Sequence, residues 1–480
     1  MSESYYNGNY TGAEIDAGIA AANAAAPQAT TYTKSEVDTA LSAKANSADL
    51  GTAAFKNMDS ALNASSTNPV QNSTLSAKFS EVDTTLDLFR LMLDATVYGF
   101  RIDKTNSDPE TRVEYLYDAA GMTPARMDYT TGTFDYGSWG NAWFITGNKP
   151  CALKYDGTID YYLDPNDYTK KTDGTASDVS DSSYAGNFMA SMPTVWIKRW
   201  EDERYLYYAF SDKQINSSFK AYAHDAGDGF INDMIYLPMF KGVIVDSKLR
   251  SIAGVTPQGG TNGSTEKTAA ETCGTGWQMW DWAKHELIAD LLTLISRSTN
   301  SQANFGEGDV NTYDSSDTTT YGKLPTGTSG AGQFWGANDE THHVKVFHIE
   351  DFWGNRTDRC LGLHLVDNEY VYKLVRPYAT TPDSTYTSSG KQAPVQGMIK
   401  NASIGEFGFL PTETGWNGAT YFCDALVPNA SGTRLLRFGS ACNVSPTTTA
   451  GDRNYILNAA ANETQWYIGA SLCFNAPHSS

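Results

Sequence analysis

Cysteine and long apolar runs are both scarce in this sequence. Its 480 residues include six cysteines, and no two of them form a CxxC pair. So few cysteines do not build a disulfide scaffold, and their spacing does not fit a zinc site. The longest apolar run, residues 287–295, is interrupted by Asp290 and Thr293 and is too short to span a bilayer. Because the N-terminus also lacks a basic segment followed by an apolar one, we expect synthesis in a reducing cytoplasm, without Sec-type secretion or membrane insertion.

Basic residues are outnumbered by acidic ones. Lys and Arg total 35 and Asp and Glu total 55, which gives a net charge of −20 at pH 7. Affinity for phosphate groups needs clustered Lys and Arg, and the sequence has no such cluster. We therefore expect no nucleic-acid partner and no binding to an anionic membrane. Hydrophobic residues make up 40% of the chain and aromatic residues 12%, so most of it can form a buried core.

The first 74 residues differ in composition from the rest and read as a linker segment. Residues 18–31 are rich in Ala and contain nothing from which to build a core. Thr33 and Glu36 then form a capping-box pattern, which predicts a short helix.

Residues 75–98 carry a heptad pattern. Six apolar residues follow one another at spacings of 4-3-4-3-4, namely Leu75, Phe79, Val82, Leu86, Phe89 and Leu93. The residues between them are mostly polar, so the apolar seam is narrow and suits self-association better than packing on a globular domain. Phe at two seam positions favours a trimer. The alternative is an amphipathic helix that packs on its own domain.

From Gly99 onward the sequence alternates short apolar and polar positions. The runs 194–200, 204–210 and 370–376 predict strands, whereas the polar stretches 170–184 and 309–332 predict loops. Residues 280–297 have the apolar period of a helix. The fold class that we expect is therefore α+β, with much irregular loop.

Motifs for catalysis are incomplete. His285 and Glu286 begin an HExxH pattern, but Ala289 stands where zinc needs the second His. A GxSxG elbow, a P-loop and a GxGxxG motif are all missing. Pairs of carboxylates for glycoside hydrolysis stay open, because their geometry cannot be read from sequence.

Two groups of residues could ligate a metal ion. The first combines histidines with nearby carboxylates: His342, His343, His348, Asp339, Glu340, Glu350 and Asp351. The second is a calcium site at Glu307 and Asp309. A solvated loop that runs into a strand at 344–349 explains the first group better, and the spacing of the second is generic. We therefore expect no metal and no cofactor.

Two sets of motifs resemble known families. Residues 32–41 (YTKSEVDTAL) and 66–72 (STNPVQN) resemble stalk segments of bacteriophage tail fibres. Residues 277–302, the motif EDFWG at 350–354, and residues 435–440 and 466–474 resemble the variable proteins of diversity-generating retroelements. That family has a C-type-lectin fold related to the fold of formylglycine-generating enzymes. The likeness covers about residues 194–474.

The resemblance implies a domain plan and a function. Residues 1–74 would attach to the phage tail, 75–98 would form the trimeric coiled-coil stalk, 99–193 would be an intermediate β-rich segment, and 194–480 would be a C-type-lectin-like receptor-binding head. The implied protein is a tail-fibre adhesin of the virion tail that binds its receptor through a diversified loop face, because in that family adenine-directed mutagenesis varies a repeat in the last segment. It would be a homotrimer made in the bacterial host cytoplasm, with tail or baseplate proteins and a bacterial surface receptor, protein or glycan, as partners.

The binding face is expected between two core strands. Residues 435–439 and 468–474 alternate in the way that strands do, and the 25 residues 441–465 between them are mostly polar, which predicts a surface loop. The residue types there suit adaptable recognition. The candidate receptor-binding residues are Asn443, Ser445, Asp452, Asn454, Tyr455, Asn458, Asn462, Thr464 and Tyr467.

Cys473 is expected to fill the core, and no motif supports a catalytic cysteine of the formylglycine-generating type. We therefore expect no enzyme activity. Two other readings stay open: a tail-borne glycan-degrading enzyme and a structural baseplate component.

Overall fold

A computed structural model describes residues 35, 38, 39, 94–415, 417–443 and 450–478. The chain divides into two compact units, Met1–Ala95 and Thr96–Ser480. Residues 35, 38 and 39 of the first unit are helical, within the helix predicted after Thr33. The heptads from Leu75 to Leu93 lie outside the described residues, so the trimeric coiled coil stays a prediction. None of the described helices has the length and apolar character needed to cross a membrane.

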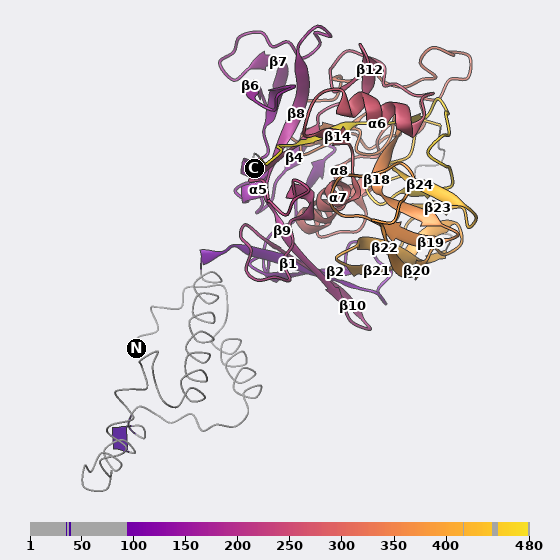
Figure 1. The fold of residues 1–480 in the computed structure, drawn as a ribbon. Helices are drawn as coiled ribbons and strands as arrows, with labels where there is room; N and C mark the ends of the chain where they lie inside the picture. The colour runs from indigo at the N-terminus through magenta and orange to yellow at the C-terminus, as the bar shows by residue number, and fades with distance from the viewer. Residues whose placement is uncertain (1–34, 36–37, 40–93, 416, 444–449, 479–480) are drawn as a thin grey trace, which may run out of the picture. The chain divides into compact units, whose positions relative to one another are not determined.

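The second unit is mostly β-sheet with few helices (Figure 1). A four-stranded sheet has the order β2 (Val113–Tyr117), β1 (Val97–Asp103), β10 (Tyr205–Ser211) and β9 (Trp196–Glu201). The strands predicted at 194–200 and 204–210 are confirmed as β9 and β10. The run 370–376 is a strand only at its start, in β19 (Glu369–Tyr372).

A seven-stranded sheet joins both sides of the boundary drawn at residue 193. Its order is β14 (Trp277–Met279), β27 (Leu472–Asn475), β11 (Met234–Pro238), β8 (Gly186–Pro193), β5 (Pro150–Lys154), β6 (Ile159–Asp164) and β7 (Asp167–Lys171). Because β8 pairs directly with β11, residues 99–193 and the C-terminal strand belong to one continuous sheet.

The largest sheet has nine strands. Along its main path lie β20 (Thr387–Gln392), β19, β18 (Thr357–Val366), β24 (Thr433–Phe438), β25 (Tyr455–Leu457), β23 (Ala425–Pro428), β21 (Gly397–Gly405) and β22 (Gly408–Gly415). A short strand, β26 (Ile468–Gly469), pairs with β18 in parallel. The edge strands β20 and β22 also contact each other, so the sheet nearly closes on itself.

Three small sheets complete the β structure. They are β3 (Arg126–Asp128) with β4 (Thr133–Asp135), β12 (Val243–Val245) with β13 (Lys248–Arg250), and β15 (Trp335–Gly336) with β16 (Val344–Val346) and β17 (Ile349–Glu350). The single strand predicted at 344–349 is therefore wrong. Phe347 and His348 have positive φ and turn the chain back into a hairpin.

Helix α7 (Trp282–Ser296) lies in the interior of the unit, and all of its residues are buried (Figure 1). It begins after Asp281, whose side chain accepts a hydrogen bond from the Lys284 amide, and it ends at Arg297 in the left-handed conformation. This confirms the helix predicted at 280–297. The other helical segments are α5 (Trp143–Thr146), η2 (Tyr222–His224), α6 (Gly263–Glu271) and α8 (Ser301–Phe305).

The core has two clusters, and strand β27 separates them. Cys473 belongs to the larger cluster, whereas Leu472 and Phe474 belong to the smaller one. The alternation predicted for this strand, with Cys473 as a core filler, is confirmed. The Phe474 ring leaves no room at Gly157, where a Cβ would lie 2.2 Å from the ring.

Candidate functional site

The nine predicted receptor-binding residues fall into three classes. Four of them are exposed: Asn443, Asn458, Asn462 and Thr464. Tyr467 is half-buried, and Ser445 lies outside the described residues. The remaining three are buried, with exposed fractions of 4% for Asp452, 3% for Asn454 and 0% for Tyr455. The expectation that all of 441–465 forms a surface loop is therefore wrong for residues 450–457.

Tyr455 is buried because it begins β25, an interior strand between β24 and β23, and Asp452 and Asn454 lie just before that strand. The Tyr455 hydroxyl donates a hydrogen bond of 2.9 Å to Glu286 Oε1 on α7. Arg453 forms ion pairs with Glu286 and with Asp290, one turn further along the same helix. The polar side chains of this segment make buried ion pairs and hydrogen bonds, and composition alone does not distinguish such a segment from an exposed loop.

A groove lies at the other end of the predicted segment. Its volume is about 540 Å³, and Thr464 and Trp466 form part of its lining. The rest of the lining includes residues 256–260, Tyr321 and Lys323, and Arg356, which immediately precedes β18. The groove therefore brings the C-terminal part of the predicted binding segment together with three segments that are distant in sequence.

Three aromatic rings stack beside the groove. The Trp466 ring lies 5.2 Å from Tyr313 and 4.7 Å from Tyr321, centroid to centroid, with interplanar angles of 11° and 14°. Lys323 Nζ lies 5.4 Å from the Tyr321 centroid and 5.5 Å from that of Trp466. Tyr467 contacts Trp466 edge to face. Stacked rings with a cation over them form a rigid wall that costs little conformational entropy when a ligand binds.

Arg356 is the unusual member of the lining. Its side chain is 1% exposed, and none of its three guanidinium nitrogens has a hydrogen-bond partner among the described residues. Burial lowers the pKa of Arg356 to about 9. Burial, and then the charge of Arg356, lowers the pKa of Lys323 to about 8. Burial outweighs the attraction of Asp358 and Glu266 at Arg356 and of Asp317 at Lys323, so both pKa shifts have the sign expected for cations that are removed from water without a close ion pair.

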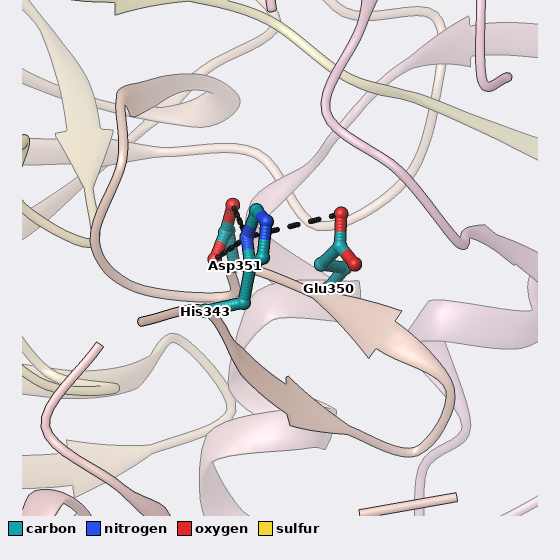
Figure 2. Close-up of side chains that lie close together, drawn as sticks. All are labelled: His343, Glu350 and Asp351. Atoms are coloured by element: carbon teal, nitrogen blue, oxygen red, sulfur yellow. Dashed lines mark hydrogen bonds and ion pairs between the residues drawn. The ribbon is translucent and has the colours of Figure 1, made fainter. Parts of the chain in front are cut away.

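A second cluster gathers His343, Glu350 and Asp351, whose ligand atoms lie within 4.8 Å of one another (Figure 2). In Figure 2, the His343 ring lies between the two carboxylates, 2.9 Å from Asp351 Oδ2 and 3.9 Å from Glu350 Oε1. Burial opposes protonation of the ring, but Asp351 and Glu350 outweigh it and raise the pKa of His343 to about 9.

The polar atoms of this cluster are engaged by protein. The amides of Gly327 and Ser329 donate to the Glu350 carboxylate, and Asn355 Nδ2 donates to Asp351. His343 Nε2 donates to the Pro325 carbonyl. A divalent cation would have to displace the proton on His343 Nδ1, so the arrangement is explained better as an ion-pair cluster that fixes residues 325–329.

The other candidate ligands are separated from this cluster. His342 is exposed and pairs with Asp339, whereas His348 is buried and contacts the Tyr168 hydroxyl. In the calcium candidate, Asp309 is buried, with Oδ1 accepting from Thr312 and Oδ2 without a partner in the described part of the chain. Burial raises its pKa to about 7, which works against a carboxylate that must be ionised to hold calcium.

Sequence reasoning missed Arg356 and Lys323. Arg356 and Arg359 stand three residues apart, and nothing in the sequence says which of them is paired. The structure shows that Arg359 pairs with Glu266 and donates to two carbonyls, whereas Arg356 does neither. The signal that pointed to this region was Trp466, through the family motif.

Comparison with protein-family models gives no match, and neither does comparison with curated proteins.

Proposed function

We propose that the chain is a homotrimeric bacteriophage tail-fibre adhesin, whose C-type-lectin-like head binds a bacterial surface receptor through the groove at Trp466. In this proposal the protein is made in the host cytoplasm and is carried on the virion tail. The N-terminal segment attaches it to tail or baseplate proteins. The observation that carries the proposal is the groove itself, which unites a rigid aromatic stack, an unpartnered cation and the exposed Thr464.

The chemistry of the groove favours binding over hydrolysis. Glycoside hydrolysis ordinarily needs two carboxylates on either side of the bond that is cleaved. The described residues that line the groove include Gln258, Lys323 and Arg356 but no Asp or Glu. A receptor that is held and not cleaved fits this set of side chains better.

Adsorption of the labelled, full-length protein to a panel of bacterial strains tests the proposal. On a strain that the parent protein binds, Trp466→Leu should reduce adsorption at least tenfold. The reason is that an aromatic anchor of an interface contributes about 2 kcal/mol to binding. Phe230→Leu is the control, since Phe230 is an exposed aromatic residue that does not line the groove.

Equal adsorption by Trp466→Leu and the parent would reject the groove as the receptor site. The proposed relationship to the variable proteins of diversity-generating retroelements has a separate test, in the genome. A reverse transcriptase gene beside a near-copy of the DNA that encodes residues 420–470 would support it, and its absence from the complete genome would argue against it.

A further inference from the structure

We infer that the groove at Trp466 binds the acidic group of a saccharide, with Arg356 and Lys323 as counter-ions and the aromatic stack as the wall for the sugar ring. This inference rests on the proposed receptor-binding function and names the chemistry of the ligand.

The first argument is the isolation of Arg356. Every other buried arginine in the part of the chain that the structure describes has at least one polar partner for its guanidinium group. Arg453 pairs with Glu286 and Asp290, Arg359 pairs with Glu266, and Arg250 donates to the Gly186 carbonyl. Removing a charge from water without a partner is costly, so an unpaired guanidinium beside a groove provides a strong site for an anion.

The second argument is the place of Lys323. It lines the same groove, and its charge and that of Arg356 are close enough to interact unfavourably. Among the described residues, its ammonium group forms no ion pair with a carboxylate. One oxyanion between the two cations would relieve this repulsion and accept charge-assisted hydrogen bonds from both, with a planar guanidinium suited to a carboxylate or a phosphate.

The third argument is the contrast with the rest of the molecule. The chain carries a net charge of −20, which repels anions at long range. Two cations in a groove whose described lining has no carboxylate are therefore a local exception. An anion must therefore make close contacts inside the groove to bind, because the net negative charge of the protein repels anions that stay further away.

The fourth argument identifies the kind of molecule to which the anionic group is attached. The faces of Trp and Tyr rings are electron-rich and pack well against apolar C–H groups. A sugar ring offers such a C–H face together with hydroxyl groups, for which Gln258 and Thr464 supply an amide and a hydroxyl. A carboxylate of a uronic acid and a phosphate ester of a sugar share this chemistry.

Calorimetric titration of the full-length protein tests the inference with glucuronate, glucose 6-phosphate, glucose and inorganic sulfate as probes. Glucuronate or glucose 6-phosphate should bind at least tenfold more tightly than glucose, and whichever binds tighter identifies the source of the oxyanion. Equal binding of glucose and both acidic sugars would overturn the inference. Sulfate that binds as tightly as the acidic sugars would overturn its saccharide part.

Arg356→Met and Lys323→Gln supply the variants. Arg356→Met keeps the length of the side chain and removes the buried charge, so it should fold at least as well as the parent while losing binding of acidic sugars by tenfold or more. Lys323→Gln should weaken the same binding and provides a second measurement if Arg356→Met fails to fold. If both Lys323→Gln and Arg356→Met fold and bind acidic sugars as tightly as the parent, the inference is overturned.

The two proposals fail separately. If Trp466→Leu abolishes adsorption to cells but acidic sugars bind no better than glucose, the receptor site stands and the acidic ligand is wrong. If acidic sugars bind through Arg356 but Trp466→Leu adsorbs like the parent, the saccharide site stands and the receptor site is elsewhere.

Discussion

Arg453 Nη2 and Asp290 Oδ1 lie 2.5 Å apart in the interior of the protein. This ion pair connects the segment 450–457 to helix α7. Arg199 on β9 pairs with the other oxygen of the same carboxylate, so one buried Asp joins three elements. Glu286 adds a second negative charge, and the two arginines and two carboxylates balance each other.

Arg453→Met should therefore destabilise the protein strongly. Among the described arginines it leaves Arg199 to face both Glu286 and Asp290, and breaking a buried pair from one side costs about 3–5 kcal/mol in the free energy of unfolding. Urea unfolding measures the change. Arg204→Met is the control, because its pair with Asp103 is largely exposed on the Arg side and should cost less than about 1 kcal/mol. Similar losses for both variants would contradict the account.

Tyr455 should behave as a core residue and not as a receptor contact. Tyr455→Phe removes the hydrogen bond to Glu286 and should cost about 1–3 kcal/mol, because the buried carboxylate loses a donor. Tyr455→Ala also leaves a cavity and should cost about 3–5 kcal/mol. Thermal melting and cell adsorption of the same samples test this. A Tyr455→Ala variant that melts like the parent but adsorbs poorly would restore Tyr455 to the binding face.

The contrast between Tyr455 and Thr464 shows how far the sequence could predict the structure. Periodicity predicted α7, β9, β10 and the alternation of β27, because each of these patterns is local. It could not separate residues 450–457 from residues 458–465, because both stretches are polar. The partners that bury the first stretch, Glu286 and Asp290, lie more than 150 residues away.

The groove could not be predicted from the sequence for the same reason: its residues are distant from one another along the chain. Trp466 belongs to the family motif at residues 466–474, but its neighbours in the groove, Tyr321, Lys323 and Arg356, come from other parts of the chain. An arginine is recognised as unpaired when no carboxylate or carbonyl lies near its guanidinium group, and such contacts cannot be read from the sequence.

The His343 cluster should make stability depend on pH. The pKa of His343 is about 9 in the folded protein, against about 6.5 in the unfolded chain. A raised folded-state pKa means that its contribution is fully present below about pH 6.5 and is lost as pH rises through 9, with a maximum of about 3 kcal/mol. His343→Gln should remove this part of the slope. Urea unfolding of both proteins from pH 6 to pH 9.5 gives the comparison, and parallel curves would contradict the prediction.

The heptads from Leu75 to Leu93 make a prediction about assembly. Light scattering on the full-length protein should give the mass of three chains, and Leu86→Asp should reduce it, because three carboxylates would meet in a dry seam. Thr84→Asp is a suitable control, since residue 84 lies on the face of the predicted helix away from the seam. A parent protein that is monomeric at micromolar concentration would contradict the prediction.

Gly259 should decide whether the groove stays open. A Cβ at this position would lie 2.1 Å from the Trp466 carbonyl oxygen and 2.8 Å from Arg356 Nη1, so Gly259→Ala must displace one wall of the groove or the other. Gly174 is the control: it does not line the groove, its φ is +84°, and a Cβ there meets nothing within 4 Å. Gly174→Ala should cost roughly 1–2 kcal/mol of stability from backbone strain while leaving the groove intact.

Both glycine variants should thus melt below the parent, but only Gly259→Ala should lose adsorption to cells, by tenfold or more, when each is assayed well below its melting temperature. This pairing separates the shape of the groove from stability, because both substitutions should destabilise the protein but only the methyl group at residue 259 meets Trp466 and Arg356. If Gly259→Ala adsorbs as well as Gly174→Ala, Trp466 and Arg356 do not form the binding site together, and the exposed Asn443, Asn458 and Asn462 become the residues to test.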